Sequence, residues 1–187
     1  SGRLLKRVAA MFFNLASSEA SPALQAIERE IAPRMAAHQS AIYLHAGLFG
    51  RIALVHAQRD VLAPRPEQRR LVERIHLDFV REGALLSAAD KQRYAQLMQG
   101  LATLTTRFGQ NVLAEESAFR LALDGEADLA GLPDFVRAAA REAAAARGVR
   151  ADGVVTLSRS LIVPFLTFSE RRDLREQAWR AWVSRGE

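Results

Sequence analysis

Apolar residues recur at helical spacing through most of this chain. The longest run follows Ser87, where an aromatic or apolar side chain returns every three or four residues, at Tyr94, Leu97, Leu101, Leu104, Phe108 and Val112. This spacing places them on one face of an α-helix. Shorter runs of the same period precede and follow it. The pattern predicts an all-α, multi-helix fold.

Glycine, proline and capping residues predict where these helices begin and end. Ser21 and Pro22 form a cap and first-turn pair, and Ser87 begins the longest run. In the stretch LAGLP at 129–133, Gly131 can take the left-handed conformation that ends a helical turn. Pro133 then favours the start of the next helix. Gly83 and Gly148 are predicted to end two further helices.

Two prolines inside apolar stretches are expected to interrupt the helical pattern. Pro33 should break or kink its helix, after which a long helix continues to residue 60 with HAGLFGR (45–51) at its middle. Pro164 should begin a brief turn, and Ser169 should cap the last helix. One short extended segment at most is predicted near 153–158, where Val154 and its neighbours are β-branched or apolar.

Composition places the chain among soluble globular proteins. Its 187 residues are 49% hydrophobic and include no cysteine, which excludes disulfides, thiolate metal ligands and a thiol nucleophile. The net charge of +5 is carried almost wholly by arginine, but Glu and Asp are interleaved with every basic cluster. We therefore expect a salt-bridged surface and no nucleic-acid partner.

The N-terminal segment superficially resembles a secretory signal, with a basic start and an apolar middle. Asn14 interrupts the apolar run, and the apolar residues fall on one helical face instead of all round. No apolar run approaches the roughly 18 residues that span a bilayer. We expect an amphipathic helix and no membrane partner.

Histidine spacing suggests a metal site that helix geometry excludes. His38, His45 and His56 return to nearly the same side of a helix, and three histidines can hold a catalytic zinc. Seven residues rise about 10.5 Å along a helix, so one ion with zinc–nitrogen bonds of about 2.0–2.1 Å cannot reach two of them. His76 stands alone, and no histidine begins an HExxH motif.

Other residue patterns assign no chemistry. Glu115 and Glu116 are adjacent, so they do not share a helical face. Ser158 and Ser160 have no histidine nearby in sequence, and the two tryptophans, three residues apart, are typical of packing. Composition and spacing therefore identify no catalytic, cofactor-binding or metal-binding residue.

Several segments, taken in order and spacing, carry a resemblance to a known family. They are MFFNLASSEASPALQAIEREIAPRMAAHQSAI at 11–42, LFGRI at 48–52, RLVERIHLDFVREGALLS at 70–87, LATLTTRFGQNVLAEE at 101–116, LAGLP at 129–133 and VVTLSRSLIVPFLTFSERRDLREQAWRAWVSRG at 154–186. Together they resemble the N-terminal half of the thimet-oligopeptidase-type zinc metallopeptidases. The bacterial peptidyl-dipeptidase branch is most similar, with oligopeptidase A next.

The resemblance implies a helical fold whose N-terminal helices wall and cap a deep channel. It also implies a zinc site on a later helix, which carries HExxH and a downstream glutamate. In such enzymes zinc activates a water molecule and the motif's glutamate acts as general base. None of these motifs occurs here, so no catalytic or metal residue is transferred to this sequence. We expect this part to be inactive by itself and to bind no cofactor, with the zinc held elsewhere in the parent enzyme.

We therefore expect residues 1–187 to be one helical domain from the N-terminal half of a cytoplasmic zinc peptidase, without its catalytic zinc domain. The parent enzyme would hydrolyse short peptides, releasing C-terminal dipeptides, and LAGLP would be a corner of the channel wall. The expected partners are peptides bound by the full-length enzyme and its missing catalytic domain. Uncovered apolar faces would also favour self-association. The alternative is a stand-alone helical binding or scaffold module for an acidic partner or nucleic acid.

Overall fold

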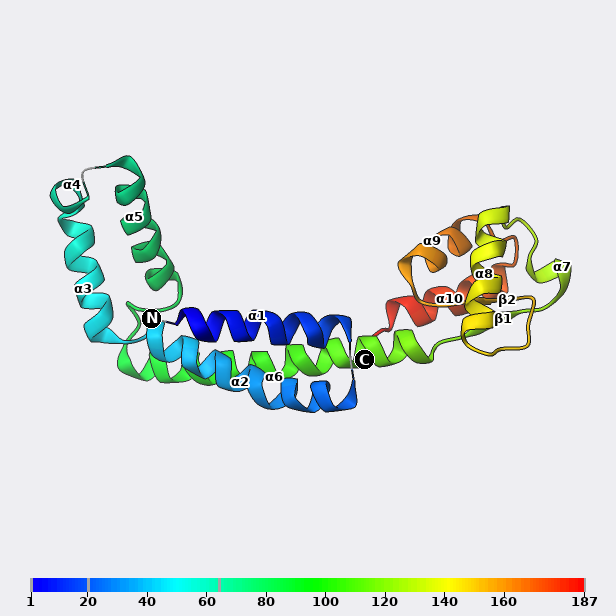
Figure 1. The fold of residues 1–187 in the computed structure, drawn as a ribbon, viewed down its shortest axis with the longest axis horizontal. Coiled ribbons are helices and arrows are strands. Elements are labelled where there is room, and N and C mark those ends of the chain that lie inside the picture. Colours follow the sequence, from blue (N-terminus) through cyan, green and yellow to red (C-terminus); the bar gives the residue numbers. More distant parts are fainter. Residues whose placement is uncertain (1, 20, 64, 187) are drawn as a thin grey trace. The chain divides into compact units, whose positions relative to one another are not determined.

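The computed structural model describes residues 2–19, 21–63 and 65–186 and confirms the all-α class (Figure 1). Helices dominate these residues, and a single pair of short strands is the only sheet among them. The chain divides into two compact units, residues 1–107 and 108–187, and each is described by itself. That residues 1–187 act as one domain in the complete protein stays a prediction.

In the described part of unit 1 (residues 1–107), every regular element is a helix. The helices are α1 (Arg3–Ser18), α2 (Pro22–Tyr43), α3 (Ala46–Ala57), α4 (Arg59–Leu62), α5 (Pro66–Arg81) and the part of α6 (Ala88–Ala118) up to residue 107. Helices α3 and α5 pack as a hairpin that α4 connects, and α1 packs on α2 (Figure 1).

Two predicted helix starts are confirmed by their capping hydrogen bonds. The Ser21 hydroxyl accepts a hydrogen bond of 3.2 Å from the Leu24 N–H, and Pro22 opens α2. The Ser87 hydroxyl accepts one of 3.2 Å from the Asp90 N–H at the start of α6. Each bond satisfies a backbone donor that the first helical turn leaves without a partner.

Neither proline ends its helix: the turn predicted at Pro164 is wrong, and of the break or kink predicted at Pro33 the break does not occur. Helix α2 runs through Pro33 and α9 (Arg159–Phe168) runs through Pro164. A proline removes one intrahelical hydrogen bond, at a cost of about 3 kcal/mol, which tertiary packing of the flanking turns can offset. In α9, Ile162 and Phe165 on either side of the proline are fully buried.

The predicted long helix through residues 34–60 is also wrong, because α2 ends at Tyr43 and α3 begins at Ala46. His45 is the N-cap of α3: its Nδ1 accepts a hydrogen bond of 3.1 Å from the Leu48 N–H. The segment 45–51 therefore opens a helix instead of lying at the middle of one. A histidine cap was not foreseen because Ser, Thr, Asp and Asn are the usual capping residues.

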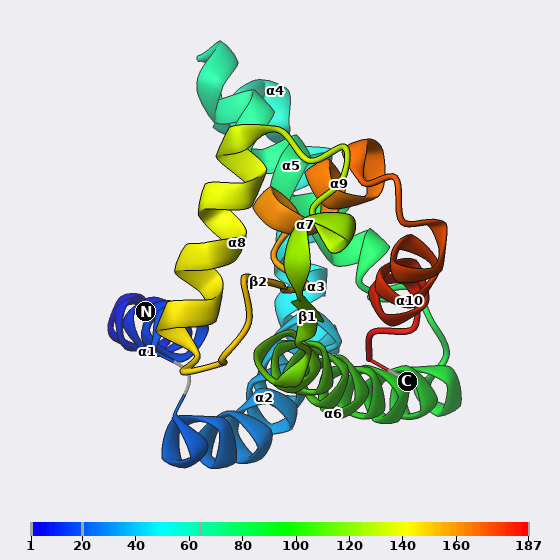
Figure 2. The ribbon, with the colours of Figure 1, turned by 90° about the vertical axis from the view of Figure 1, so that its right-hand side faces the viewer.

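Unit 2 (residues 108–187) has a well-packed core. Its elements are the end of α6, β1 (Leu121–Leu123), α7 (Gly125–Asp128), α8 (Asp134–Ala146), β2 (Gly153–Val155), α9 and α10 (Arg172–Val183). Figure 2 shows α9 between α8 and α10, and it contacts both. The core between these helices and the two strands contains Leu123, Val136, Ala140, Val155, Leu157, Ile162 and Phe165, among others.

The two strands pair antiparallel, with Leu121 opposite Val155 and Leu123 opposite Gly153. Strand β2 lies in the segment predicted to be extended, whereas β1 was not predicted. Helix α8 packs closely on β2, since a Cβ at Gly153 would lie 2.9 Å from the Cβ of Ala140. Ser169 does not cap α10, because that helix begins at Arg172 and the Ser169 hydroxyl accepts from the Arg171 N–H instead.

Candidate functional site

The LAGLP corner is held against the connection between α9 and α10. Gly131 has a φ of +78°, the predicted left-handed conformation, and a Cβ there would lie 2.4 Å from the carbonyl oxygen of Phe168. The Glu170 N–H donates a hydrogen bond of 3.1 Å to the Ala130 carbonyl. Only glycine allows both the backbone conformation and this close approach, so the corner is rigidly positioned within unit 2.

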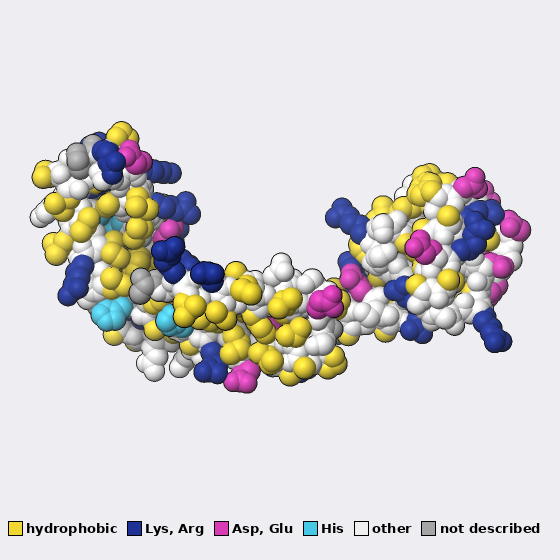
Figure 3. Space-filling model, viewed as in Figure 1, with side chains coloured by type: hydrophobic (Ala, Val, Ile, Leu, Met, Phe, Trp, Pro, Cys, Tyr) yellow, Lys and Arg dark blue, Asp and Glu magenta, His cyan; other side chains and the backbone are white. Residues whose placement is uncertain are grey.

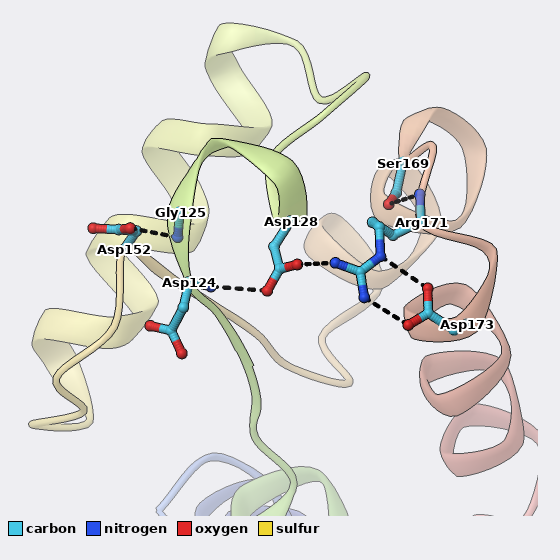
Figure 4. A network of polar contacts seen from close by, with 7 residues as sticks. All are labelled: Asp124, Gly125, Asp128, Asp152, Ser169, Arg171 and Asp173. Carbon is cyan, nitrogen blue, oxygen red and sulfur yellow. Dashed lines mark hydrogen bonds and ion pairs between the residues drawn. The ribbon is translucent and has the colours of Figure 1, made fainter.

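A charged network beside the corner joins the same segments (Figure 4). The Arg171 guanidinium donates to Asp128 and, through two bonds of 2.9 and 2.6 Å, to Asp173. Asp128 also accepts from the Asp124 N–H at 3.0 Å. The hydrogen bonds from Arg171 lower the pKa of Asp173 to about 2. A carboxylate that is ionised and paired in this way cannot supply a proton near neutral pH, so the network ties α7 to α10.

Arg137 of α8 reinforces the corner from its other side. Its guanidinium donates to the carbonyls of Leu132 (3.1 Å) and Leu129 (3.0 Å) and to the Glu126 carboxylate (2.7 Å). Two carbonyls of LAGLP therefore have a fixed charged donor. Sequence reasoning missed this role because an arginine within a helical run carries no signal of its partners in the folded chain.

The four histidines do not converge. His38 is exposed on α2 and His45 caps α3, whereas His56 of α3 and His76 of α5 stack with ring centroids 4.0 Å apart and planes 10° apart. Burial, followed by the nearby charges of His56 and Arg59, lowers the pKa of His76. No sequence pattern indicates this pair, since the two residues lie on different helices.

The described residues do not fit a zinc ion, because no group of three or more His, Asp or Glu side chains among them could hold a metal. No step of peptide hydrolysis is therefore assigned to this chain's own residues.

Glu115, Glu116 and Ser158, considered in the sequence as candidates, have structural partners within unit 2. Glu116 pairs with Arg185, and Glu115 accepts a hydrogen bond of 2.8 Å from the Gly186 N–H. The Ser158 hydroxyl accepts from the Thr156 hydroxyl at 3.1 Å, next to the start of α9. These contacts stabilise unit 2.

Unit 1 exposes long apolar stripes on two helices. On α1, Leu4, Val8, Met11 and Leu15 are 50–75% exposed, and on α6, Leu97, Leu101 and Leu104 are 56–64% exposed. The spacing of each set follows the four-and-three pattern of a helix that packs along another helix. Among its described residues, unit 1 buries only Ala16, Ser40, Ala63, Phe79, Gly83 and Ala84.

A groove between α1 and α2 continues this apolar surface. It measures about 430 Å³ and its lining includes Val8, Phe12, Phe13, Ile31 and Met35. Figure 3 shows hydrophobic side chains gathered over the part of unit 1 that contains these helices. Contiguous apolar surface of this kind marks a site of interaction with other protein.

Comparison with known proteins identifies the relatives of this chain. No family model matches it. The dipeptidyl carboxypeptidase of Salmonella typhimurium is 35% identical over all 187 residues, and that of Escherichia coli is 34% identical over the same length. The chain is similar to these dipeptidyl carboxypeptidases along its whole length. Oligopeptidase A of Haemophilus influenzae follows at 28% identity over 153 residues, which is 82% of the chain. The resemblance seen in the sequence is thereby confirmed.

The chain spans 28% of the length of the two dipeptidyl carboxypeptidases and 22% of that oligopeptidase A. It corresponds to a minor part of these peptidases. No helix among the described residues combines the length and the apolar character that crossing a bilayer requires.

Proposed function

We propose that this chain is a non-catalytic helical part, a wall and cap of the substrate channel, of a cytoplasmic zinc metallopeptidase. The parent enzyme hydrolyses short peptides and releases dipeptides from their C-termini. Zinc, held by residues outside this chain, supplies the activated water for hydrolysis. The part described here shapes the channel and limits entry to short, unstructured peptides.

The observation that carries this proposal is the similarity to dipeptidyl carboxypeptidases along the entire chain, combined with its coverage of only 28% of them. Because the 34–35% identity extends over all 187 residues of this chain, it favours the same fold and the same role as the matching part of those peptidases. The rest of the parent protein is the natural partner for surface that this part leaves uncovered.

The exposed apolar stripes of unit 1 support the same proposal. Three leucines on α6, each more than half exposed, would each gain about 1–2 kcal/mol if another helix buried their remaining surface. A free-standing binding module would leave this gain unused and would tend to aggregate. We therefore assign α1 and α6 to the interface with the remainder of the enzyme.

The deciding experiment is to express the native reading frame that continues beyond this chain and to assay the purified product. Release of the C-terminal dipeptide from an N-acetylated tetrapeptide, lost with a chelator and restored by Zn²⁺, is the expected result. A protein without peptidase activity, or with activity that the chelator does not affect, would overturn the proposal.

A complementation assay tests the interface itself. The chain and the separately expressed remainder should recover activity when mixed, and Leu101→Glu should weaken recovery at least tenfold because it places a charge in the apolar stripe. Gln96→Glu, which adds the same charge to an exposed position of α6 outside the stripe, is the matched control. Equal losses from the two substitutions would contradict the assignment of this face.

A further inference from the structure

The outer face of α10 holds a mixed polar and aromatic depression that the proposed channel role does not use. Arg175 lies about one helical turn after Arg172, and Trp179 about one turn after Arg175, so the three residues share a face of the helix. Together with Glu176 and with Leu166 of α9, they line an open depression of about 450 Å³. All five residues belong to unit 2.

The charges around this depression leave guanidinium donors available to a ligand. Within the part of the chain that the structure describes, Arg172 has no hydrogen-bond or ion-pair partner. Arg175 uses one amino group to donate to the Ser169 carbonyl, which orients its side chain and leaves its other donors unused. The one acid of the lining, Glu176, is paired with Arg180 at 2.7 Å. An incoming anion therefore meets two unneutralised arginines.

The apolar side of the depression favours a ligand that also carries a hydrophobic group. Trp179 is 53% exposed, in contrast to Trp182, which packs against the core and lies under the Arg185 guanidinium at 3.5 Å. Leu166 is half-buried and presents its remaining surface beside the indole. An exposed indole next to arginines binds flat or aliphatic groups by burial and stacking.

We propose that this depression is a secondary binding site for the free C-terminal carboxylate of short peptides whose last side chain is aromatic or aliphatic. The arginine forks hold the carboxylate, since guanidinium and carboxylate geometries match through paired hydrogen bonds. The last side chain of the peptide lies on Trp179 and Leu166. The choice of peptides as ligand class rests on the proposed function.

A single carboxylate fits this site better than a polyanion does. The paired carboxylates of Glu176 and Asp173 lie on the same helix as the two arginines and limit the positive field to one small region. A chain of phosphates would bring further charges against these acids. Nucleic acid is therefore not the ligand that this arrangement selects.

The test is an NMR titration of the 187-residue chain, in which the two indole N–H signals are followed separately. The probe is N-acetyl-Ala-Ala-Phe with a free carboxylate, added to about 10 mM because an open surface site binds weakly. The Trp179 signal should shift to saturation while the Trp182 signal stays nearly constant. The same peptide with a C-terminal amide should bind at least tenfold more weakly.

Substitutions separate this site from general charge attraction. Arg172→Ala should weaken binding about tenfold without affecting the fold, because Arg172 is exposed and supports no other described residue. Arg141→Ala removes an exposed arginine of α8 outside the depression and is the matched control. Arg175→Lys keeps the charge but loses the fork, and should weaken binding severalfold.

The proposal would be overturned if the peptide acid and the peptide amide bound equally well. Equal effects of Arg172→Ala and Arg141→Ala on peptide binding would also overturn it, as would the absence of a saturable shift of the Trp179 signal. Inorganic phosphate that competes as strongly as the peptide would also overturn it, by showing a general anion site. These results are independent of hydrolysis by the longer protein. If the longer protein had peptidase activity but the Trp179 signal did not respond to the peptide, the proposed binding site would be contradicted and the proposed function would not.

Discussion

Replacing Gly131 by alanine is expected to destabilise unit 2 by about 2.5–6.5 kcal/mol. The left-handed backbone at this residue costs an alanine about 1–2 kcal/mol. The new Cβ would lie 2.4 Å from the Phe168 carbonyl oxygen, so the corner must move away at a cost of about 1–3 kcal/mol. That movement also lengthens the hydrogen bond from Glu170 to Ala130, which contributes about 0.5–1.5 kcal/mol.

Gly148→Ala provides the control for the backbone cost alone. Gly148 has a φ of +62°, and no heavy atom lies within 4 Å of the position that its Cβ would occupy. Its replacement should therefore cost only about 1–2 kcal/mol. The difference between the two variants isolates the close approach of the corner to the connection between α9 and α10.

The assay is urea denaturation followed by tryptophan fluorescence. Both tryptophans of the chain, Trp179 and Trp182, lie in unit 2, so the emission reports unfolding of that unit. The midpoint for Gly131→Ala should fall well below that for Gly148→Ala at unchanged slope. If the two alanine variants lose the same stability, the corner does not depend on its contact with Phe168 and our reasoning about LAGLP is refuted.

Two further predictions concern pH. Asp173 should titrate near pH 2 by NMR in the native chain and close to its ordinary 3.8 in Arg171→Met, because the hydrogen bonds from Arg171 lower its pKa; an unchanged titration would contradict this. That pairing stabilises unit 2 above about pH 4, and its contribution is lost as the pH falls towards 2. His76, whose pKa is lowered from 6.5 by burial, His56 and Arg59, stabilises unit 1 while neutral. Hydrogen exchange of the α3–α5 hairpin should therefore speed up as the pH falls below about 6.5, after correction for the intrinsic rate, and less so in His76→Gln.

Helix ends were the part of the fold that the sequence predicted best. The Ser21 and Ser87 caps, and the left-handed glycine of LAGLP, depend on backbone groups within about four residues. A short window of sequence therefore contains all the residues on which such a signal depends. The peptidase resemblance was likewise readable from ordered segments, and the comparisons confirm it.

Predictions failed or were silent where the outcome depended on distant packing. Pro164 remains inside a helix in which Ile162 and Phe165, on either side of it, are fully buried, and strand β1 exists because β2 provides its hydrogen-bond partners. No local pattern in LAL at 121–123 distinguishes a strand from a helix end.

The same limit applies to the site. The sequence by itself determined that this chain is helical, where several of its helices begin and end, and which peptidases it resembles. Only the tertiary structure decided that Arg171 joins Asp128 to Asp173, that His56 stacks on His76, and which apolar stripes stay exposed. Local backbone preferences act between neighbours in the sequence, whereas these contacts join residues that become neighbours only when the helices pack.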